Sequence, residues 1–285
     1  LQGANEEAAM LVGNLAPDPV TAIDLFAGAI LPGLMLVVLF IIFIFFYARI
    51  NPLSCPPVET TRSRGEIYIE AAKSVIPPIT LIVLVLGSIL FGIATPTESA
   101  SVGAVGAAMI ALLKGELNFK NLKETAIGTV KLSSFVFVIL IGASMFSLVF
   151  RAFGGDEMIE HFLGNLPGGL YAALILVMVV IFLLGFFLDY IEIIFVIVPL
   201  VGPILIANGA DPLWLGILIS LNLQTSFLTP PFGFSLFFLR GVAPDNIQTK
   251  NMYKGVIPFI GIQILAILIV GFYPEIATWL PSKMF

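Results

Sequence analysis

Residues 213–239 read LWLGILISLNLQTSFLTPPFGFSLFFL, an apolar run that is interrupted by Pro230 and Pro231. A helix of about 20 apolar residues crosses a bilayer, so this run is long enough to span one. Each proline removes an N–H donor and clashes with the preceding turn, and the residue before a proline is pushed out of the α conformation. The sequence therefore predicts a membrane helix that opens before the prolines and restarts near Gly233.

The predicted opening is rich in polar side chains, namely Gln224, Thr225, Ser226 and Thr229. In a simple proline kink, hydroxyls of this kind replace the lost partners of the freed carbonyls. The alternative is a binding site, because opened carbonyls and hydroxyls suit a monovalent cation and the N-terminal end of the second half-helix suits an anionic group. We favour the binding site, since two adjacent prolines and four polar neighbours are more than a kink needs.

The composition of the 285 residues is that of a membrane protein. Hydrophobic residues make up 59% and charged residues 11% of the chain, against about 45–50% and about 25% in soluble proteins. This excludes a water-soluble enzyme, and 13 Lys+Arg against 18 Asp+Glu gives no basic surface for nucleic acid. We expect an all-α, multi-spanning protein whose main solvent is the lipid bilayer.

The few basic residues predict which loops are cytoplasmic, because Lys and Arg are enriched there. Most of them gather in three loops, at 49–73, 114–123 and 240–254, with Arg151 and Lys283 among the exceptions, whereas residues 152–239 contain neither Lys nor Arg. The N-terminal stretch and the loop at 152–168 carry acidic residues and are placed outside.

Two pairs of apolar segments, 75–94 with 99–113 and 170–188 with 191–207, could each be two full spans or a hairpin that enters only halfway. If the second pair spanned fully, its turn at 189–192 would be a cytoplasmic loop with two acids and no base, against the positive-inside rule. We therefore predict two spans in the first pair and a re-entrant hairpin in the second.

The turn of the second pair carries Asp189 and Glu192. A carboxylate inside the membrane costs about 2.5–3.5 kcal/mol on insertion scales, so both are candidate functional residues. The alternative is an interfacial turn that lipid headgroups solvate.

In the first pair, Thr95-Pro96-Thr97-Glu98 is typical of a capped helix start. A ligand role for Glu98 is the less favoured interpretation.

With these motifs in view, the chain resembles the large membrane subunit of the tripartite ATP-independent periplasmic (TRAP) transporters, the DctM-like family. The resemblance covers essentially the whole chain, keeps the order of the motifs, and corresponds to the C-terminal part of a family member. The matching stretches are residues 24–33, 92–100, 184–189, 209–216, 228–233, 256–259 and 273–275.

The resemblance implies an elevator-type secondary transporter of the bacterial inner membrane, built from two inverted repeats. Each repeat has a hairpin followed by a broken helix, and this chain holds the second of them. It further implies a periplasmic substrate-binding protein, a small membrane subunit, an organic acid substrate that is usually a carboxylate, and Na⁺ as coupling ion without any other cofactor. Residues 189–192 and 224–227 resemble a branch that takes up 2-oxo acids or other monocarboxylates.

The implied site lies where the hairpin tip meets the opened helix, with Na⁺ near Gly185, Ser226 and Thr229 and the carboxylate against the second half-helix. The candidate site residues are Gly185, Asp189 and Glu192 at the hairpin tip and Thr225, Ser226, Thr229, Pro230, Pro231 and Gly233 in the broken helix.

The expected organisation combines the charge pattern with the resemblance. Its segments are an extracytoplasmic loop (1–25), a membrane helix ending the first repeat (26–49), a cytoplasmic loop (50–74), scaffold-type membrane helices (75–150) with an interfacial helix (115–127), a periplasmic loop (151–169), the re-entrant hairpin (170–207), the broken helix (213–239) and the last membrane helix (256–279).

Two other functions stay open at this point. A channel or pore-forming protein could be gated at the Pro-Pro break. An intramembrane enzyme could use Asp189 and Glu192 as a carboxylate pair, but the sequence offers it no nucleophile or metal-ligand set.

Overall fold

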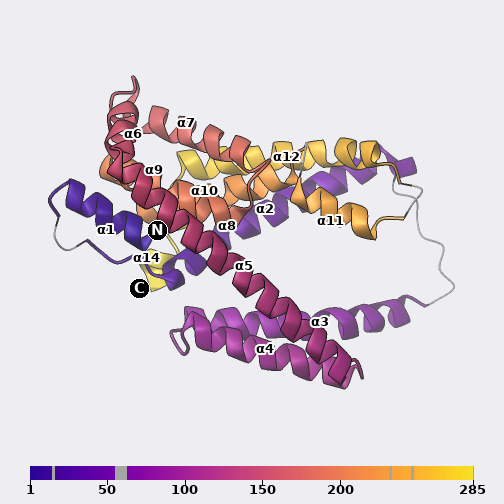
Figure 1. Cartoon of the computed structure of the whole chain (residues 1–285). Coiled ribbons are helices and arrows are strands. Elements are labelled where there is room, and N and C mark those ends of the chain that lie inside the picture. The colour runs from indigo at the N-terminus through magenta and orange to yellow at the C-terminus, as the bar shows by residue number, and fades with distance from the viewer. Residues whose placement is uncertain (15–16, 55–62, 231–232, 245–246, 285) are drawn as a thin grey trace. The chain divides into compact units, whose positions relative to one another are not determined.

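The computed structural model describes residues 1–14, 17–54, 63–230, 233–244 and 247–284, and within them it contains helices and no strands (Figure 1). Six helices in these residues are long and apolar enough to cross a membrane. They are Ala22–Ile50, Gly65–Leu90, Pro96–Leu113, Phe119–Ala152, Tyr190–Ala207 and Thr249–Phe272. The all-α, multi-pass architecture predicted from the sequence is confirmed.

The chain divides into two compact units. The smaller one comprises residues 42–134 and contains the pair of helices α3 (Arg64–Leu90) and α4 (Pro96–Leu113), together with a short 3₁₀ helix, η1 (Pro52–Ser54). The larger one comprises residues 1–41 and 135–285. Two long helices, α2 (Ala22–Ile50) and α5 (Phe119–Ala152), contribute residues to both units.

The α3–α4 pair has a capped start of α4 and a pair of serines between the two helices. The Thr95 hydroxyl accepts a hydrogen bond from the Glu98 N–H, and the Glu98 carboxylate accepts one from the Thr95 N–H at 2.8 Å, which completes a capping box. Ser88 and Ser99 join the helices through their hydroxyls at 2.8 Å. The structure thus uses Glu98 in the helix cap that the sequence predicts.

The larger unit holds the hairpin and the broken helix. Its remaining elements are α1 (Gln2–Leu11), α6 (Gly155–Gly164), α7 (Gly169–Leu184), α8 (Tyr190–Glu192), the π-helix η2 (Ile193–Ile197), α9 (Val198–Ala207), α10 (Pro212–Leu228), α11 (Phe234–Val242), α12 (Thr249–Phe272), α13 (Glu275–Thr278) and α14 (Pro281–Met284).

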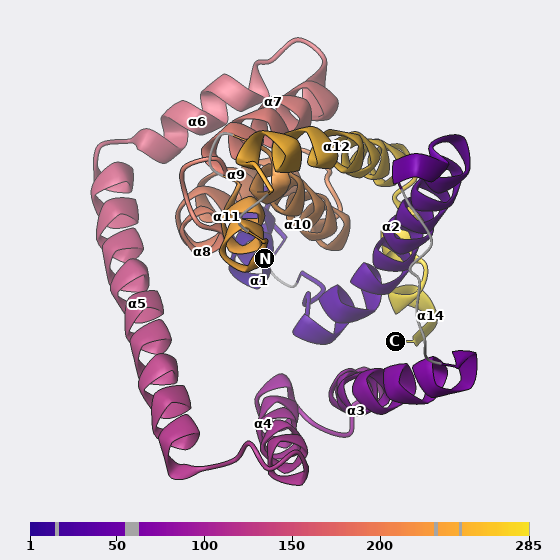
Figure 2. The ribbon, with the colours of Figure 1, turned by 90° about the vertical axis from the view of Figure 1, so that its right-hand side faces the viewer.

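Helix α10 packs against both α7 and α12, and Figure 2 shows it beside α12 within this unit. Its residues from Leu213 to Leu223 are buried, except for Ser220. The indole N–H of Trp214 donates to the carbonyl of Val270 on α12 at 2.7 Å. This buried hydrogen bond fixes the first half of the broken helix against the last long helix.

The hairpin consists of α7 as its first arm and α8, η2 and α9 as its second, joined by the non-helical residues 185–189. The second arm widens into a π-helix in which the Val198 N–H bonds the carbonyl of Ile193. Pro199 follows at once and cannot donate the next bond of an α-helix, which accounts for the irregular turn at this position.

Helix α1 packs along the second arm of the hairpin. The contact is made by small residues, since a Cβ on Gly202 would lie 3.2 Å from the Cβ of Ala4. Glu7, also on α1, pairs with Arg151 at the end of α5 at 2.8 Å. The two arms of the hairpin therefore face different neighbours, α10 on one side and α1 on the other.

Three segments differ in detail from the expected organisation. The stretch 1–25 contains the helix α1, α3 begins at Arg64 within the stretch 50–74, and residues 115–127 are not a separate helix because α5 runs without a break from Phe119. Nothing between Phe119 and the apolar part of α5 stops a helix, so the amphipathic turns continue into the span. The sides of the membrane on which the loops lie stay a prediction.

Candidate functional site

The end of α10 is shaped by Pro230. Because this proline has no N–H, the carbonyl of Ser226 loses its helical donor, and Thr229 is in the extended conformation (φ −91°, ψ 130°). Two hydrogen bonds from Thr229 satisfy carbonyls in the last turn of α10. Its N–H donates to the Ser226 carbonyl at 3.0 Å, and its hydroxyl donates to the Thr225 carbonyl at 2.8 Å. The helix opens where the sequence predicts it.

The second half of the broken helix begins at Gly233, the N-cap of α11. Gly233 has φ +40°, a left-handed conformation that glycine adopts without the strain a Cβ would bring. Its carbonyl accepts bonds from the N–H groups of Leu236 and Phe237 at 2.7 and 3.1 Å. The N–H groups that precede these in the first turn have no partners of the regular helical kind, as at any helix N-terminus. Pro231 lies outside the described residues.

The hairpin tip touches α10 through a glycine. Gly185 ends α7 with its backbone buried, and a Cβ added to it would lie 2.2 Å from the Oγ and 2.8 Å from the Cβ of Ser226. No side chain fits in that space. The φ of Gly185 is −64°, so closeness of approach, and not backbone conformation, requires glycine here.

The two acidic residues of the tip are half-buried. The Asp189 carboxylate accepts a bond from the N–H of Tyr190 at 2.8 Å and so caps the short helix α8. The ring of Tyr190 reaches the end of α10, where its centroid lies 6.2 Å from that of Phe227. Within the described part of the chain, neither Asp189 nor Glu192 has an ion-pair partner, as the lack of bases over 152–239 predicts.

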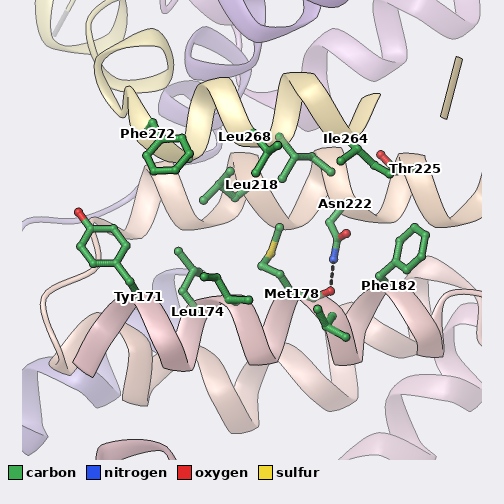
Figure 3. Close-up of a pocket in the computed structure, with 14 residues that line it drawn as sticks. Tyr171, Leu174, Met178, Phe182, Leu218, Asn222, Thr225, Ile264, Leu268 and Phe272 are labelled. Carbon is green, nitrogen blue, oxygen red and sulfur yellow. Dashed lines mark hydrogen bonds between the residues drawn. The ribbon is translucent and has the colours of Figure 1, made fainter. Parts of the chain in front are cut away.

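The polar residues of α10 point to different sides, although they are adjacent in sequence. Ser226 is fully buried and faces Gly185. Thr225, also fully buried, lines a cavity of about 300 Å³ between α7, α10 and α12 (Figure 3). Gln224 is exposed. The structure therefore brings Gly185 and Ser226 together, puts Thr229 one turn beyond Thr225, and turns the Thr225 side chain toward the cavity.

Asn222 is a polar residue of this region that the sequence analysis did not single out. Its side chain is 4% exposed, and its Nδ2 donates to the carbonyl of Met178 on α7 at 2.7 Å (Figure 3). The available signal was an amide side chain in a largely apolar stretch, one turn before Ser226. Its partner is 44 residues away in the chain, and no local pattern identifies a partner at that distance.

Comparison with known proteins identifies the family. Residues 11–276 match the family model described as "Tripartite ATP-independent periplasmic transporter, DctM component". The chain belongs to this family. The DctM family comprises permease subunits of transporters and not enzymes, and this chain is accordingly a multi-pass protein of the bacterial inner membrane.

Three curated relatives illustrate the range of the DctM family. The chain is 31% identical to the C4-dicarboxylate TRAP transporter large permease protein DctM of Vibrio cholerae, over 91% of this chain and 61% of that protein. It is 30% identical to the ectoine TRAP transporter large permease protein TeaC of Halomonas elongata, over 92% and 60%. It is 23% identical to the sialic acid TRAP transporter large permease protein SiaM of Vibrio cholerae, over 98% and 67%. The chain spans about three fifths of the length of the first relatives that it matches.

Proposed function

We propose that this chain belongs to the large permease of a secondary transporter that imports an organic anion together with sodium. Ion and solute bind where the hairpin tip meets the opening of the broken helix. The observation that carries the proposal is the contact of Gly185 with Ser226, one turn before the break. The C-terminal ends of α7 and α10 thereby meet where α10 has lost its regular hydrogen bonds.

The cation is assigned to the end of α10. The C-terminal end of a helix carries a partial negative charge, and unwound carbonyls and hydroxyls are oxygen ligands of the kind that a hard cation prefers. Asp189 and Glu192 add negative charge to the same hairpin tip, and residues 152–239 contain no Lys or Arg to neutralise it. Sodium is therefore expected near Gly185, Ser226 and Thr229.

The anion is assigned to the start of α11, because the free N–H groups and the positive end of the helix dipole at a helix N-terminus bind carboxylates. No basic side chain of the hairpin or of α10 is available for this purpose. The relatives are named for C4-dicarboxylate, ectoine and sialic acid, compounds that all carry a carboxylate. For this chain a 2-oxo acid or another monocarboxylate is the favoured substrate, because residues 189–192 and 224–227 resemble the branch of the family that takes up such acids.

Coupling follows from the shared position of the two ligands. A cation that bridges the hairpin tip and α10 holds the tip closed, and a closed tip completes the pocket for the solute. Each ligand then raises the affinity for the other by the same factor. We further propose the partners and the motion of the family: a periplasmic binding protein that delivers the acid, a small membrane subunit, and elevator-type movement of the hairpin and broken helix.

The test is uptake of radiolabelled pyruvate, lactate and succinate by proteoliposomes that contain the protein with its two proposed partners. We expect saturable uptake that requires both the binding protein and an inward sodium gradient, with one of the monocarboxylates preferred. Uptake that is unchanged when choline replaces sodium would contradict the coupling. Conductance of the same liposomes without the binding protein would instead favour a channel gated at the Pro-Pro break.

A further inference from the structure

The contact between the hairpin and the broken helix has a second, polar anchor. Asn222 on α10 donates its Nδ2 hydrogen to the carbonyl of Met178 on α7 at 2.7 Å (Figure 3). Among the described residues this is the side-chain hydrogen bond that joins α7 to α10. Thr225, Ser226 and Thr229 all donate to carbonyls of α10 itself, so they do not connect the two helices.

The two anchors lie along one seam between the helices. Asn222 precedes Ser226 by four residues, and Met178 precedes Gly185 by seven. At about 3.6 residues per turn, these spacings are close to one and two full turns, so each pair of residues lies on one face of its helix. The amide bond and the Gly185–Ser226 contact therefore share the same interface.

The remaining contacts of this interface are apolar and do not set its register. In a membrane, lipid tails are as apolar as leucine, so packing of Leu, Ile and Phe side chains gives little preference for one register over another. A single buried amide with a directional bond does give such a preference, as polar residues do in coiled coils. The register matters here, because a slip by one residue would bring Leu184 or Phe186 to the place of Gly185, where no Cβ fits.

The surroundings of Asn222 leave its donor no substitute. It lines the cavity of about 300 Å³ whose other lining residues are almost all apolar. A cavity of that character does not hold ordered water well. A lost bond to Met178 is then not replaced by a bond to solvent.

We propose that Asn222 is a positioning residue of the transport site, whose amide holds α7 in the register that places Gly185 against Ser226. It acts through the hairpin and touches neither ion nor solute. The expected effect of Asn222 on transport rests on the proposed function. The structural part of the inference, the control of tip position, can be tested without any transport.

The test reports tip position by cross-linking. In a Cys55→Ser background, cysteines replace Tyr190 and Phe227, whose ring centroids are 6.2 Å apart, and the rate of cross-linking by a short bifunctional thiol reagent is measured in liposomes. We compare Asn222→Leu, which removes the donor at similar size, with Asn222→Gln, which keeps an amide. Ser220→Ala is the matched control on the same helix, because its hydroxyl donates to the Gly216 carbonyl of its own helix.

We expect Asn222→Leu to slow cross-linking roughly three- to twentyfold, the effect of one interhelical hydrogen bond in a membrane. Asn222→Gln should be intermediate and Ser220→Ala should equal the parent. In uptake assays, Asn222→Leu should raise the half-saturating sodium concentration by a similar factor and change the maximal rate less.

Cross-linking of Asn222→Leu at the parental rate would overturn the inference, and so would an equal slowing by Ser220→Ala. If Asn222→Leu does not accumulate as folded protein, the same criterion applies to Asn222→Gln. Absence of uptake by the parent with every acid would count against the proposed function, whereas slow cross-linking in Asn222→Leu would still support the positioning role.

Discussion

Replacement of Gly185 by alanine is the most direct perturbation of the candidate site. It adds one methyl group at the point where the hairpin tip meets α10. The backbone of Gly185 has φ −64°, which alanine adopts without strain, so the substitution probes contact distance alone.

The expected magnitude follows from the contact. The new Cβ would lie 2.2 Å from the Oγ and 2.8 Å from the Cβ of Ser226, where ordinary contact begins at 3.4 Å. The hydroxyl can swing away only by giving up its bond to the Leu223 carbonyl, and the Cβ can move only with α10, which is buried. Overpacking of this kind costs about 1–3 kcal/mol, which corresponds to a decrease of roughly 5- to 150-fold in the closed-tip equilibrium.

Sodium-dependent uptake is the assay, supported by the rate of cross-linking between cysteines at Tyr190 and Phe227. Gly185→Ala should raise the half-saturating sodium concentration by a factor of roughly 5 to 150 and slow cross-linking in parallel. Gly261→Ala in α12 is the matched control, because a Cβ there meets nothing within 4 Å. Alanine is also the better helix former at that position, so this control should be as stable as the parent.

A second substitution separates the steric explanation from a general loss of stability. Ser226→Ala in the Gly185→Ala background removes the closest atom and should restore the cross-linking rate in part, while Ser226→Gly removes both close atoms and should restore it further. Sodium dependence is not the readout here, because the Ser226 hydroxyl is itself a proposed ligand. If Gly185→Ala cross-links at the rate of Gly261→Ala, or if neither change at Ser226 restores the cross-linking rate, the close approach of tip and helix is refuted.

Three further changes test other parts of the molecule. Thr229→Ala removes a hydroxyl from the opening and should raise the half-saturating sodium concentration about tenfold, whereas Thr229→Ser should not; sodium titration of uptake decides. A cysteine at Tyr190 should react slowly with an impermeant maleimide from outside, and ready labelling from the cytoplasmic side would restore two full spans. Ser99→Val breaks the hydroxyl pair with Ser88 and should lower the free energy of unfolding of the purified protein by about 0.6–1.7 kcal/mol without altering the sodium dependence of uptake.

Much of the fold could be predicted because its causes are local in the sequence. Pro230 ends α10 and Gly233 starts α11 through rules that involve only neighbouring residues. Asp189 caps the second arm of the hairpin in the same local way. The contact of Gly185 with Ser226 was implied by the family resemblance and not by any local pattern, since the two residues come from different helices.

What could not be predicted depends on which way side chains point and on pairing over long distances. Adjacent residues on a helix are about 100° apart, so a cluster that looks uniform in sequence is distributed over several faces. Thr225 lines the cavity, Ser226 meets the hairpin, and Gln224 is exposed. The pairing of Asn222 with Met178 depends on the docking of two helices. The sequence therefore predicts the position of the candidate site along the chain but not which polar side chains face the hairpin.

The directions of the hydroxyl bonds sharpen the chemistry of the opening. Ser226 and Thr229 each donate their one hydroxyl hydrogen to a carbonyl of α10, so only oxygen lone pairs remain for a ligand. Such oxygens can coordinate a cation but cannot donate to a carboxylate. A carboxylate must then find its donors elsewhere, and the N–H groups at the start of α11 are the donors that the break supplies. Substitutions at these hydroxyls should accordingly change sodium dependence more than the choice among organic acids, and the reverse result would place the anion at the end of α10.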